Sequence, residues 1–265
     1  GVGAPLPRKE DERFMRGRGR YVADIKPAGT REVAFLRSPL AHARILGARV
    51  PVDIRDQVFL AQDLTGVQPI RAVSALPGFK PSVQPALADE KVRYVGELVA
   101  MCVADTRAEA EDIAARVEID FEELAAIHDM LQARDADAAL LHEEWGDNVF
   151  LESFVDVGDV DAVAARAAIK VEREFRTARQ CMSPIEGRGV IAEWDTRLEQ
   201  LIMHSATQMP HIVRSGLAEC LGIDHGRVRI ISPDVGGGFG YKGILLAEEV
   251  ALGWLAMRLG CPVRW

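Results

Sequence analysis

The sequence predicts an α+β protein with two units, each built from strands and helices. Three observations support this class. Short apolar runs bounded by turn residues, which are typical of strands, occur along both halves of the chain. Segments with helical spacing and capping residues lie between them. A glycine-rich loop, residues 236–243, separates a strand from a long apolar helix. At roughly 150 residues per domain, 265 residues leave room for one large domain or two small ones.

The first unit is expected over residues 15–125, after a loose lead-in at residues 1–14 that is rich in proline and charge. A helix should begin at Thr106, because Thr106 and Glu109 form a capping box in front of apolar residues at helical spacing. A loop with three prolines is expected at residues 76–87. The strands of this unit are predicted at residues 31–39, 43–50, 57–61, 91–105 and 117–124. Residues 91–105 form either one long strand or a hairpin bent at Gly96.

A linker is expected at residues 126–150, followed by a second unit over residues 151–265. Asp159 can cap a short helix that runs through Ala168. Two longer helices are expected at residues 210–221, with Pro210 in the first turn, and at residues 244–259. The second of these is apolar nearly all round and should be largely buried. Strands are predicted at residues 169–176, 187–195, 199–207, 227–235 and 262–265, the second and third forming a hairpin around residues 195–197.

Composition excludes several classes of protein. With 32 Lys and Arg against 40 Asp and Glu, the net charge is −8, which argues against a general nucleic-acid binder. No run reaches the ~20 apolar residues of a membrane span, and the first residues do not resemble a secretory signal. The cysteines are far apart and form no C-x-x-C pair, which argues against a zinc or iron–sulfur site and favours buried thiols in the cytoplasm. They are Cys102, Cys181, Cys220 and Cys261.

The glycine loop is the strongest local motif. Four glycines fall within five residues between a strand and a helix: Gly236, Gly237, Gly238 and Gly240. Glycine permits positive φ and close approach of the backbone to a ligand, and amides at a helix N-terminus favour anionic or oxo groups. Residues 238–243 match G-x-G-x-x-G, but the acidic residue that a dinucleotide site needs ~20 positions later is missing. The loop is therefore predicted to contact a ligand rather than to form a simple turn.

A second motif, residues 205–211, joins a strand to the start of a helix. The amide of Gln208 could donate to an oxo group or accept from a substrate. Taken alone, however, the motif is interpreted as a helix cap, with Thr207 as the capping residue. His211 is interpreted as a helix-start residue rather than a metal ligand, because no second His or Cys lies at ligand spacing.

Two charged motifs admit both a functional and a plain interpretation. Glu186 and Arg188 could act together in a functional site, but a surface ion pair between them is favoured. The arginines of residues 16–20 could touch a phosphate, but a solvated entry loop is favoured in this acidic chain. No Ser-His-Asp order or paired-carboxylate set stands out.

Together these motifs resemble the molybdopterin-binding large subunit of the molybdenum hydroxylases, the family of xanthine dehydrogenase, aldehyde oxidase and carbon monoxide dehydrogenase. Residues 19–25 and 38–44 are similar to the start of that family's α/β hammerhead domain. Residues 206–211 and 233–242 are similar to the first half of its molybdenum-binding region. The resemblance implies a hammerhead domain followed by the first portion of a mixed α/β molybdopterin-binding domain.

The resemblance also implies roles for individual residues. Gln208 occupies the position of a Gln that hydrogen-bonds the apical oxo ligand of molybdenum. Phe239 and Gly240 match a Phe-Gly pair that approaches the molybdenum and the pterin dithiolene, and Gly237 and Gly238 shape that loop. The implied cofactor is molybdenum with molybdopterin, either plain or as the cytosine dinucleotide. The implied reaction is hydroxylation of a small heteroaromatic or aldehyde substrate with water as oxygen source, the electrons leaving to [2Fe-2S] and FAD subunits.

Departures from the family pattern set further expectations. Xanthine-oxidising members carry a Glu just after the loop lysine, where this chain has Gly243. This difference argues against a purine as the substrate. Residues 186–188 resemble a variant of carbon-monoxide-dehydrogenase-like members. The family's catalytic Glu lies near the end of a much longer subunit. We therefore expect the chain to be inactive alone, its active site completed by a second polypeptide, and its last strand to find partners elsewhere. The alternative function is a non-catalytic assembly or anion-binding module.

Overall fold

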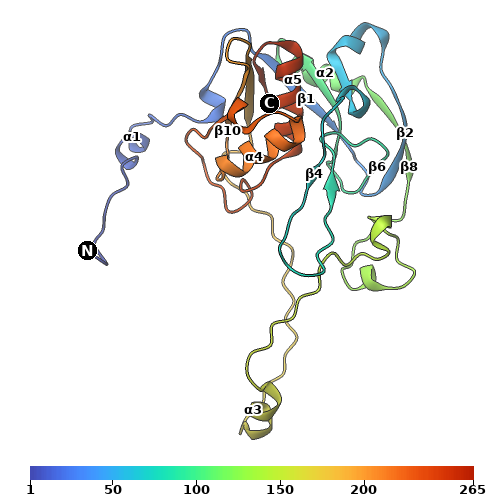
Figure 1. Ribbon diagram of the computed structural model, residues 1–265, viewed down its shortest axis with the longest axis vertical. Helices are drawn as coiled ribbons and strands as arrows, with labels where there is room; N and C mark the ends of the chain where they lie inside the picture. The colour runs from blue at the N-terminus through green and yellow to red at the C-terminus, as the bar shows by residue number, and fades with distance from the viewer. The chain divides into compact units, whose positions relative to one another are not determined.

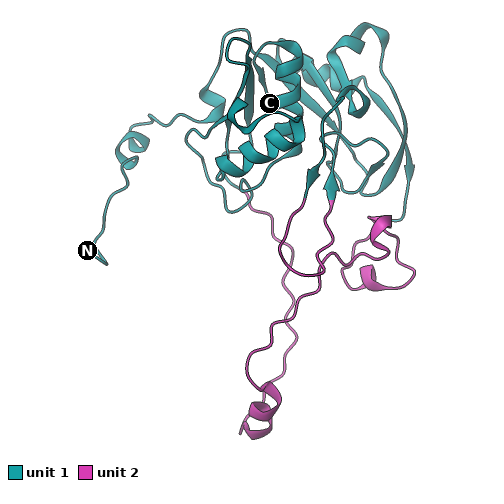
Figure 2. Ribbon diagram, viewed as in Figure 1, with its two compact units in different colours: residues 1–71, 83–126, 184–265 teal, residues 72–82, 127–183 magenta.

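The computed structural model describes residues 1–265, which fold into two compact units. The larger unit comprises residues 1–71, 83–126 and 184–265, and the smaller unit comprises residues 72–82 and 127–183 (Figure 2). All the strands belong to the larger unit. None of the helices has the length and apolar character needed to cross a membrane.

A seven-stranded mixed sheet, in the order β11-β10-β9-β12-β1-β7-β3, is the centre of the larger unit. Its strands are β1 (Arg31–Arg37), β3 (Val58–Leu60), β7 (Leu98–Ala104), β9 (Val190–Asp195), β10 (Gln200–Ser205), β11 (Val228–Ile231) and β12 (Val263–Arg264). The predicted hairpin is confirmed, since β9 and β10 pair in antiparallel register from Asp195 opposite Gln200. Strands from both sequence-predicted units thus lie in one sheet.

The position of β12 corrects the expectation that the last strand finds its partners elsewhere. β12 pairs in parallel with β1 and antiparallel with β9, in the middle of the sheet. Backbone hydrogen bonds between Val190 and Trp265 extend the second pairing. The error arose because strand pairing is non-local: the apolar residues predict a buried strand but not its neighbours.

Two smaller sheets complete the strand inventory. One has the order β6-β2-β8, and the other pairs β4 with β5. These strands are β2 (Ala43–Arg49), β4 (Ile70–Arg71), β5 (Val83–Gln84), β6 (Lys91–Val92) and β8 (Glu118–Glu123). The bend expected at Gly96 is present, with φ of 92°. The two segments on either side of it, β6 and β7, lie in different sheets, so residues 91–105 form neither one strand nor a hairpin.

Helix α2 (Arg107–Ala115) begins as the capping box predicts. The Thr106 hydroxyl accepts from the Glu109 N–H at 3.3 Å, and the Glu109 carboxylate accepts from the Thr106 N–H at 3.1 Å. Ala110 and Ile113 are buried in a cluster with residues of β1 and β7. The short 3₁₀ helices of the chain are η1 (Val22–Asp24), η2 (Val52–Gln57), η3 (Ala61–Asp63), η4 (Gln132–Arg134), η5 (Glu143–Trp145) and η6 (His225–Arg227).

Helices α4 (Pro210–Leu221) and α5 (Ala247–Leu259) lie close together beside β10 (Figure 1). Both end as predicted, at Gly222 and Gly260, each with φ of 65°. α5 begins three residues later than predicted, because the Glu249 carboxylate accepts from the Leu246 N–H and caps the helix there. α5 is largely buried, as predicted, and shares one core with apolar residues of α4, β10, β7 and β12.

The lead-in at residues 1–14 is less irregular than predicted. Helix α1 (Asp11–Met15) forms there. The Asp11 carboxylate accepts from the backbone N–H of Arg8 at 3.0 Å, and acidic Asp11 and Glu12 occupy the first turn, where the helix dipole favours negative charge.

The smaller unit contains one α-helix, α3 (Val160–Arg166), capped by Asp159 as predicted. The Asp159 carboxylate accepts from the Ala162 N–H at 2.8 Å. The strand predicted at residues 169–176 is wrong. Its alternating apolar residues Ile169, Val171 and Phe175 are exposed and no strand pairs with them. A period-two pattern predicts a strand only where a neighbour supplies the ladder of hydrogen bonds.

The cysteines are all free thiols. Cys102 and Cys220 are buried and Cys261 is half-buried, whereas Cys181 is exposed, which corrects the expectation of buried thiols at that position. Burial raises the pKa of Cys102 to about 12 and that of Cys220 to about 11, so both stay protonated at neutral pH.

Candidate cofactor site

The glycine loop between β11 and α5 adopts a conformation that requires its glycines. Gly237 and Gly240 have φ of 98° and 83°. A Cβ at Gly238 would lie 2.3 Å from Cδ of Gln208, and a Cβ at Gly236 would lie 2.5 Å from Cβ of Glu186. The loop backbone thus approaches two side chains more closely than any other residue type allows.

Phe239, at the centre of the loop, combines two unusual properties. Its φ is 55°, which is uncommon for a non-glycine residue. Its side chain is not buried: the residue is 70% exposed. Strained backbone carrying an exposed aromatic ring is typical of functional loops rather than of packing.

The Gln208 side chain is bound to the loop. Its Oε1 accepts from the N–H of Gly240 at 3.0 Å, and its backbone N–H donates to the carbonyl of Lys242 at 2.9 Å. Because Oε1 must face the Gly240 amide, the orientation of the side-chain amide is fixed. Nε2 makes no hydrogen bond within the chain and remains a donor on an exposed residue. The structure therefore brings together the two motifs that the sequence singled out.

Three loop amides add donors beside Gln208. The backbone N–H groups of Gly237, Gly238 and Phe239 donate to no acceptor within the chain. Backbone amides without internal partners bind anionic or strongly accepting groups well. The donor set around Gly238 thus matches an acceptor-rich ligand.

Lys242 is a residue whose role the sequence did not predict, and its partner is Glu186, for which a role in a site was the less favoured interpretation. The Lys242 side chain is 0% exposed and its Nζ lies 2.8 Å from Oε2 of Glu186, which is 17% exposed. The same Oε2 accepts from the N–H of Gly236 at 2.7 Å. A lysine inside a glycine loop was the available signal, because a buried ammonium needs a carboxylate partner.

The favoured interpretation of Glu186 and Arg188 as a surface ion pair is wrong. Arg188 instead donates to the buried carboxylate of Glu248 at 3.2 Å, and Arg37 donates to the same oxygen at 2.9 Å. The Arg188 guanidinium also lies 5.0 Å from the ring centroid of Tyr241, in the glycine loop. Glu186 and Arg188 thus each pair with a buried residue that is distant in sequence, Lys242 and Glu248 respectively. The spacing of residues in the sequence does not reveal these partners.

The favoured interpretation of Thr207 as a helix cap is also wrong. Its hydroxyl donates to the carbonyl of Lys242 at 3.1 Å and accepts from the N–H of Met209 at 3.1 Å. The N-cap of α4 is Met209, without a side-chain cap. His211 is exposed in the first turn of α4, as predicted. Thr207 therefore attaches the end of β10 to the glycine loop.

Two acidic residues anchor the ends of the loop region. The Ser205 hydroxyl donates to the Glu249 carboxylate at 2.5 Å, and burial raises the pKa of Glu249 to about 7. Asp234, just before the glycines, pairs with Arg13 and accepts from the N–H of Arg20 at 2.7 Å. The hydrogen bonds from Arg13 lower the pKa of Asp234 to about 2.

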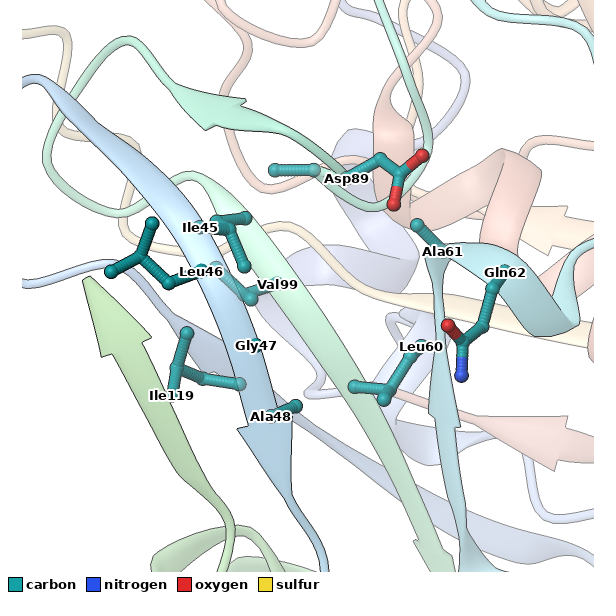
Figure 3. A pocket seen from close by; sticks show the side chains of 11 residues that line it. Ile45, Leu46, Gly47, Ala48, Leu60, Ala61, Gln62, Asp89, Val99 and Ile119 are labelled. Carbon is teal, nitrogen blue, oxygen red and sulfur yellow. The ribbon is translucent and has the colours of Figure 1, made fainter. Parts of the chain in front are cut away.

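A cavity of about 270 Å³ lies elsewhere in the larger unit (Figure 3). Side chains of β2, β3, β7 and β8 line it, with Asp89 and Gln62 as its polar members. None of its lining residues belongs to the glycine loop or to residues 205–209. The cavity is thus separate from the candidate cofactor site.

Comparison with known proteins gives two family matches. Residues 16–125 match the aldehyde oxidase and xanthine dehydrogenase a/b hammerhead domain, and residues 141–265 match the molybdopterin cofactor-binding domain. The chain is 34% identical to the nicotine 6-hydroxylase large subunit of Paenarthrobacter nicotinovorans, over 100% of this chain and 33% of that protein. It is 33% identical to the carbon monoxide dehydrogenase large chain of Hydrogenophaga pseudoflava, over 97% of this chain and 34% of that protein.

Solved structures agree with these matches. Quinoline 2-oxidoreductase from Pseudomonas putida 86 superposes with a TM-score of 0.91 at 37% identity, covering 99% of this chain and 34% of that chain. The Cu,Mo-CO dehydrogenase superposes with a TM-score of 0.84 at 31% identity, covering 100% of this chain and 35% of that chain. The chain spans about a third of the length of these relatives. With its hammerhead and molybdopterin cofactor-binding domains, the chain belongs to the large-subunit family of the molybdenum hydroxylases.

Proposed function

We propose that the chain is part of a molybdenum-dependent hydroxylase and that Gln208 and the glycine loop contact its molybdenum–molybdopterin cofactor. The observation that carries the proposal is the hydrogen bond from the Gly240 N–H to Gln208 Oε1, which leaves the Nε2 donor of Gln208 beside the glycine loop. This site lies inside the segment that matches the molybdopterin cofactor-binding domain. The domain boundaries at residues 15–125 and 151–265 belong to the same proposal.

The residues present fit such a cofactor. Gln208 Nε2 is positioned to donate to an oxo group, and the free amides of Gly237, Gly238 and Phe239 suit further acceptors. The absence of a Cβ at Gly238 lets the Gln208 side chain lie against the loop backbone, and a Cβ at Gly240 would meet nothing within 4 Å, so the loop has room for a bulky group at Gly240. The exposed ring of Phe239 supplies apolar surface next to these donors.

When bound, the molybdenum–pterin group supplies hydroxylation with oxygen from water and accepts two electrons from the substrate. The contribution of this chain is orientation. Gln208 binds and orients the group through a donor whose direction the Gly240 amide fixes. Because the donor is held before the reaction begins, no reorganisation of the protein is needed at that point.

The substrate and partners belong to the proposal as well. The names of nicotine 6-hydroxylase and quinoline 2-oxidoreductase, among its relatives, favour a small nitrogen heteroaromatic substrate. An aldehyde is the second candidate, since an aldehyde oxidoreductase from Desulfovibrio gigas shares the fold with a TM-score of 0.87.

We propose that the rest of the large subunit completes the site. Partner subunits with [2Fe-2S] and FAD would take up the electrons, in a complex that resides in the cytoplasm. The cofactor would be plain molybdopterin or its cytosine dinucleotide.

Metal and pterin analysis of the assembled complex tests this function. The complex should contain one molybdenum and one pterin per large subunit, measured by plasma mass spectrometry and by fluorescence of the oxidised pterin. The polypeptide of residues 1–265 alone should contain neither in stoichiometric amount. An assembled complex without molybdenum would favour the non-catalytic assembly or anion-binding module, and full occupancy of the isolated polypeptide would contradict the need for a second polypeptide.

A further inference from the structure

The side chain of Lys242 is a buried charge with one carboxylate partner. It is 0% exposed, and its Nζ lies 2.8 Å from Glu186 Oε2. A buried ammonium group loses its hydration and is tolerated only when it is paired and hydrogen-bonded. The position of Lys242 is therefore tied to that of Glu186.

Glu186 in turn holds the first glycine of the loop. Its Oε2 accepts from the N–H of Gly236 at 2.7 Å, and its backbone N–H donates to the carbonyl of Gly236 at 3.2 Å. No Cβ fits at Gly236, since it would lie 2.5 Å from Cβ of Glu186. One carboxylate oxygen thus binds Gly236 at the start of the loop and Lys242 near its end.

The backbone of Lys242 makes the connection to Gln208. The carbonyl of Lys242 accepts from the N–H of Gln208 at 2.9 Å and from the hydroxyl of Thr207 at 3.1 Å. A shift of Lys242 would therefore move the Gln208 backbone. It would also change the distance between Gln208 Oε1 and the Gly240 N–H, now 3.0 Å.

From these contacts we propose that Lys242 and Glu186 are positioning residues. Their ion pair holds the glycine loop and the Gln208 amide in the positions from which they contact the cofactor. The inference rests on the proposed function, because it assigns the pair a purpose at that site. Stability alone does not require the pair, since well-packed apolar residues of similar volume often replace a buried ion pair without loss. What apolar side chains lack is a carboxylate oxygen for the Gly236 amide.

The test uses the assembled complex with its full-length large subunit and the variants Lys242→Met and Glu186→Gln. Each should lower kcat per bound molybdenum by about tenfold to a hundredfold, the range expected for a misplacement near 1 Å, with KM changed less than about twofold. The Mo(V) electron paramagnetic resonance spectrum should change its g-values in both variants, because the donor beside the metal is displaced. Glu32→Gln is the matched control: it disrupts the half-buried Glu32–Arg264 pair between β1 and β12 and should leave the spectrum and kcat unchanged.

The outcomes separate the two claims. A wild-type complex that lacks molybdenum contradicts the proposed function itself. A wild-type complex with molybdenum whose variants keep the wild-type spectrum and kcat per molybdenum overturns the positioning role, even if their melting temperature falls. If Lys242→Met does not assemble, Glu186→Gln decides alone, since glutamine keeps the side-chain size and an acceptor for Gly236.

Discussion

At the scale of single residues, the candidate site depends on contacts that only particular side chains can make. From the sequence, the glycine loop predicts a ligand contact, and the family resemblance implies roles for Gln208 and Phe239 as candidate site residues. The sequence marks Lys242 by its place in the glycine loop and Glu186 as a possible site residue, but it could not pair them, because 56 residues separate the two partners. Their ion pair is a product of the fold, and no local spacing encodes it.

Replacing Gln208 tests its role as a donor. Gln208→Ala removes both the donor and the bond to Gly240, whereas Gln208→Glu keeps an acceptor for the Gly240 N–H but removes the Nε2 donor. Both variants should assemble normally and lower kcat by about tenfold to a thousandfold, the effect of losing one preorganised donor. Steady-state kinetics per bound molybdenum measures this loss. If Gln208→Glu turned over at the wild-type rate, Gln208 Nε2 would have no role as a donor in the site.

Gly238 gives a second residue-scale prediction. In Gly238→Ala the new Cβ would meet the end of the Gln208 side chain at 2.3 Å, and that flexible side chain is expected to move away from Gly240. Turnover per molybdenum should fall by about tenfold or more, while loss of the hydrogen bond costs only about 1 kcal/mol of unfolding free energy. Gly187→Ala is the control, because a Cβ there meets nothing within 4 Å. Equal turnover of the two variants would show that the close approach at Gly238 has no function.

At the scale of elements, local signals predicted what local interactions determine. The Thr106 capping box, the ends of α4 and α5 at Gly222 and Gly260, and the β9–β10 hairpin are confirmed. The strand expected at residues 169–176 failed because its alternating apolar residues have no neighbouring strand in the chain. The start of α5 was misplaced because the sequence does not show that Glu249 caps it at Leu246.

Glu249 links β10 to α5 and should make stability depend on pH. Burial raises its pKa from the ordinary 4.5 to about 7, so between these values the folded state binds a proton that the unfolded state has released. This contribution is fully present below about pH 4.5 and is lost as pH rises through about 7. Glu249→Gln should therefore flatten the fall in melting temperature between pH 5 and pH 8. Calorimetry of the assembled complex at several pH values measures the melting temperature of variant and wild type. If the two melting temperatures fell in parallel with pH, the raised pKa of Glu249 would be contradicted.

At the scale of the whole molecule, one sheet and one core unite the two family domains. β12 lies between β1 and β9, and apolar residues of β7, β10, α4 and α5 share a single cluster. The sequence indicated two units because the segment between them is irregular, but it could not indicate that Val263 returns to pair beside Arg31. This arrangement places the end of β10 and the start of α5 side by side, where Ser205 bonds Glu249 and Thr207 bonds Lys242.

The central claim is that the glycine loop and Gln208 contact a molybdenum–molybdopterin cofactor. An anomalous difference map at the molybdenum absorption edge, from crystals of the assembled complex, tests it most directly. We expect a single strong peak per large subunit, beside Gln208 Nε2 and the backbone of residues 237–240. A peak remote from these residues, or a complex whose crystals contain no molybdenum peak, would contradict the claim.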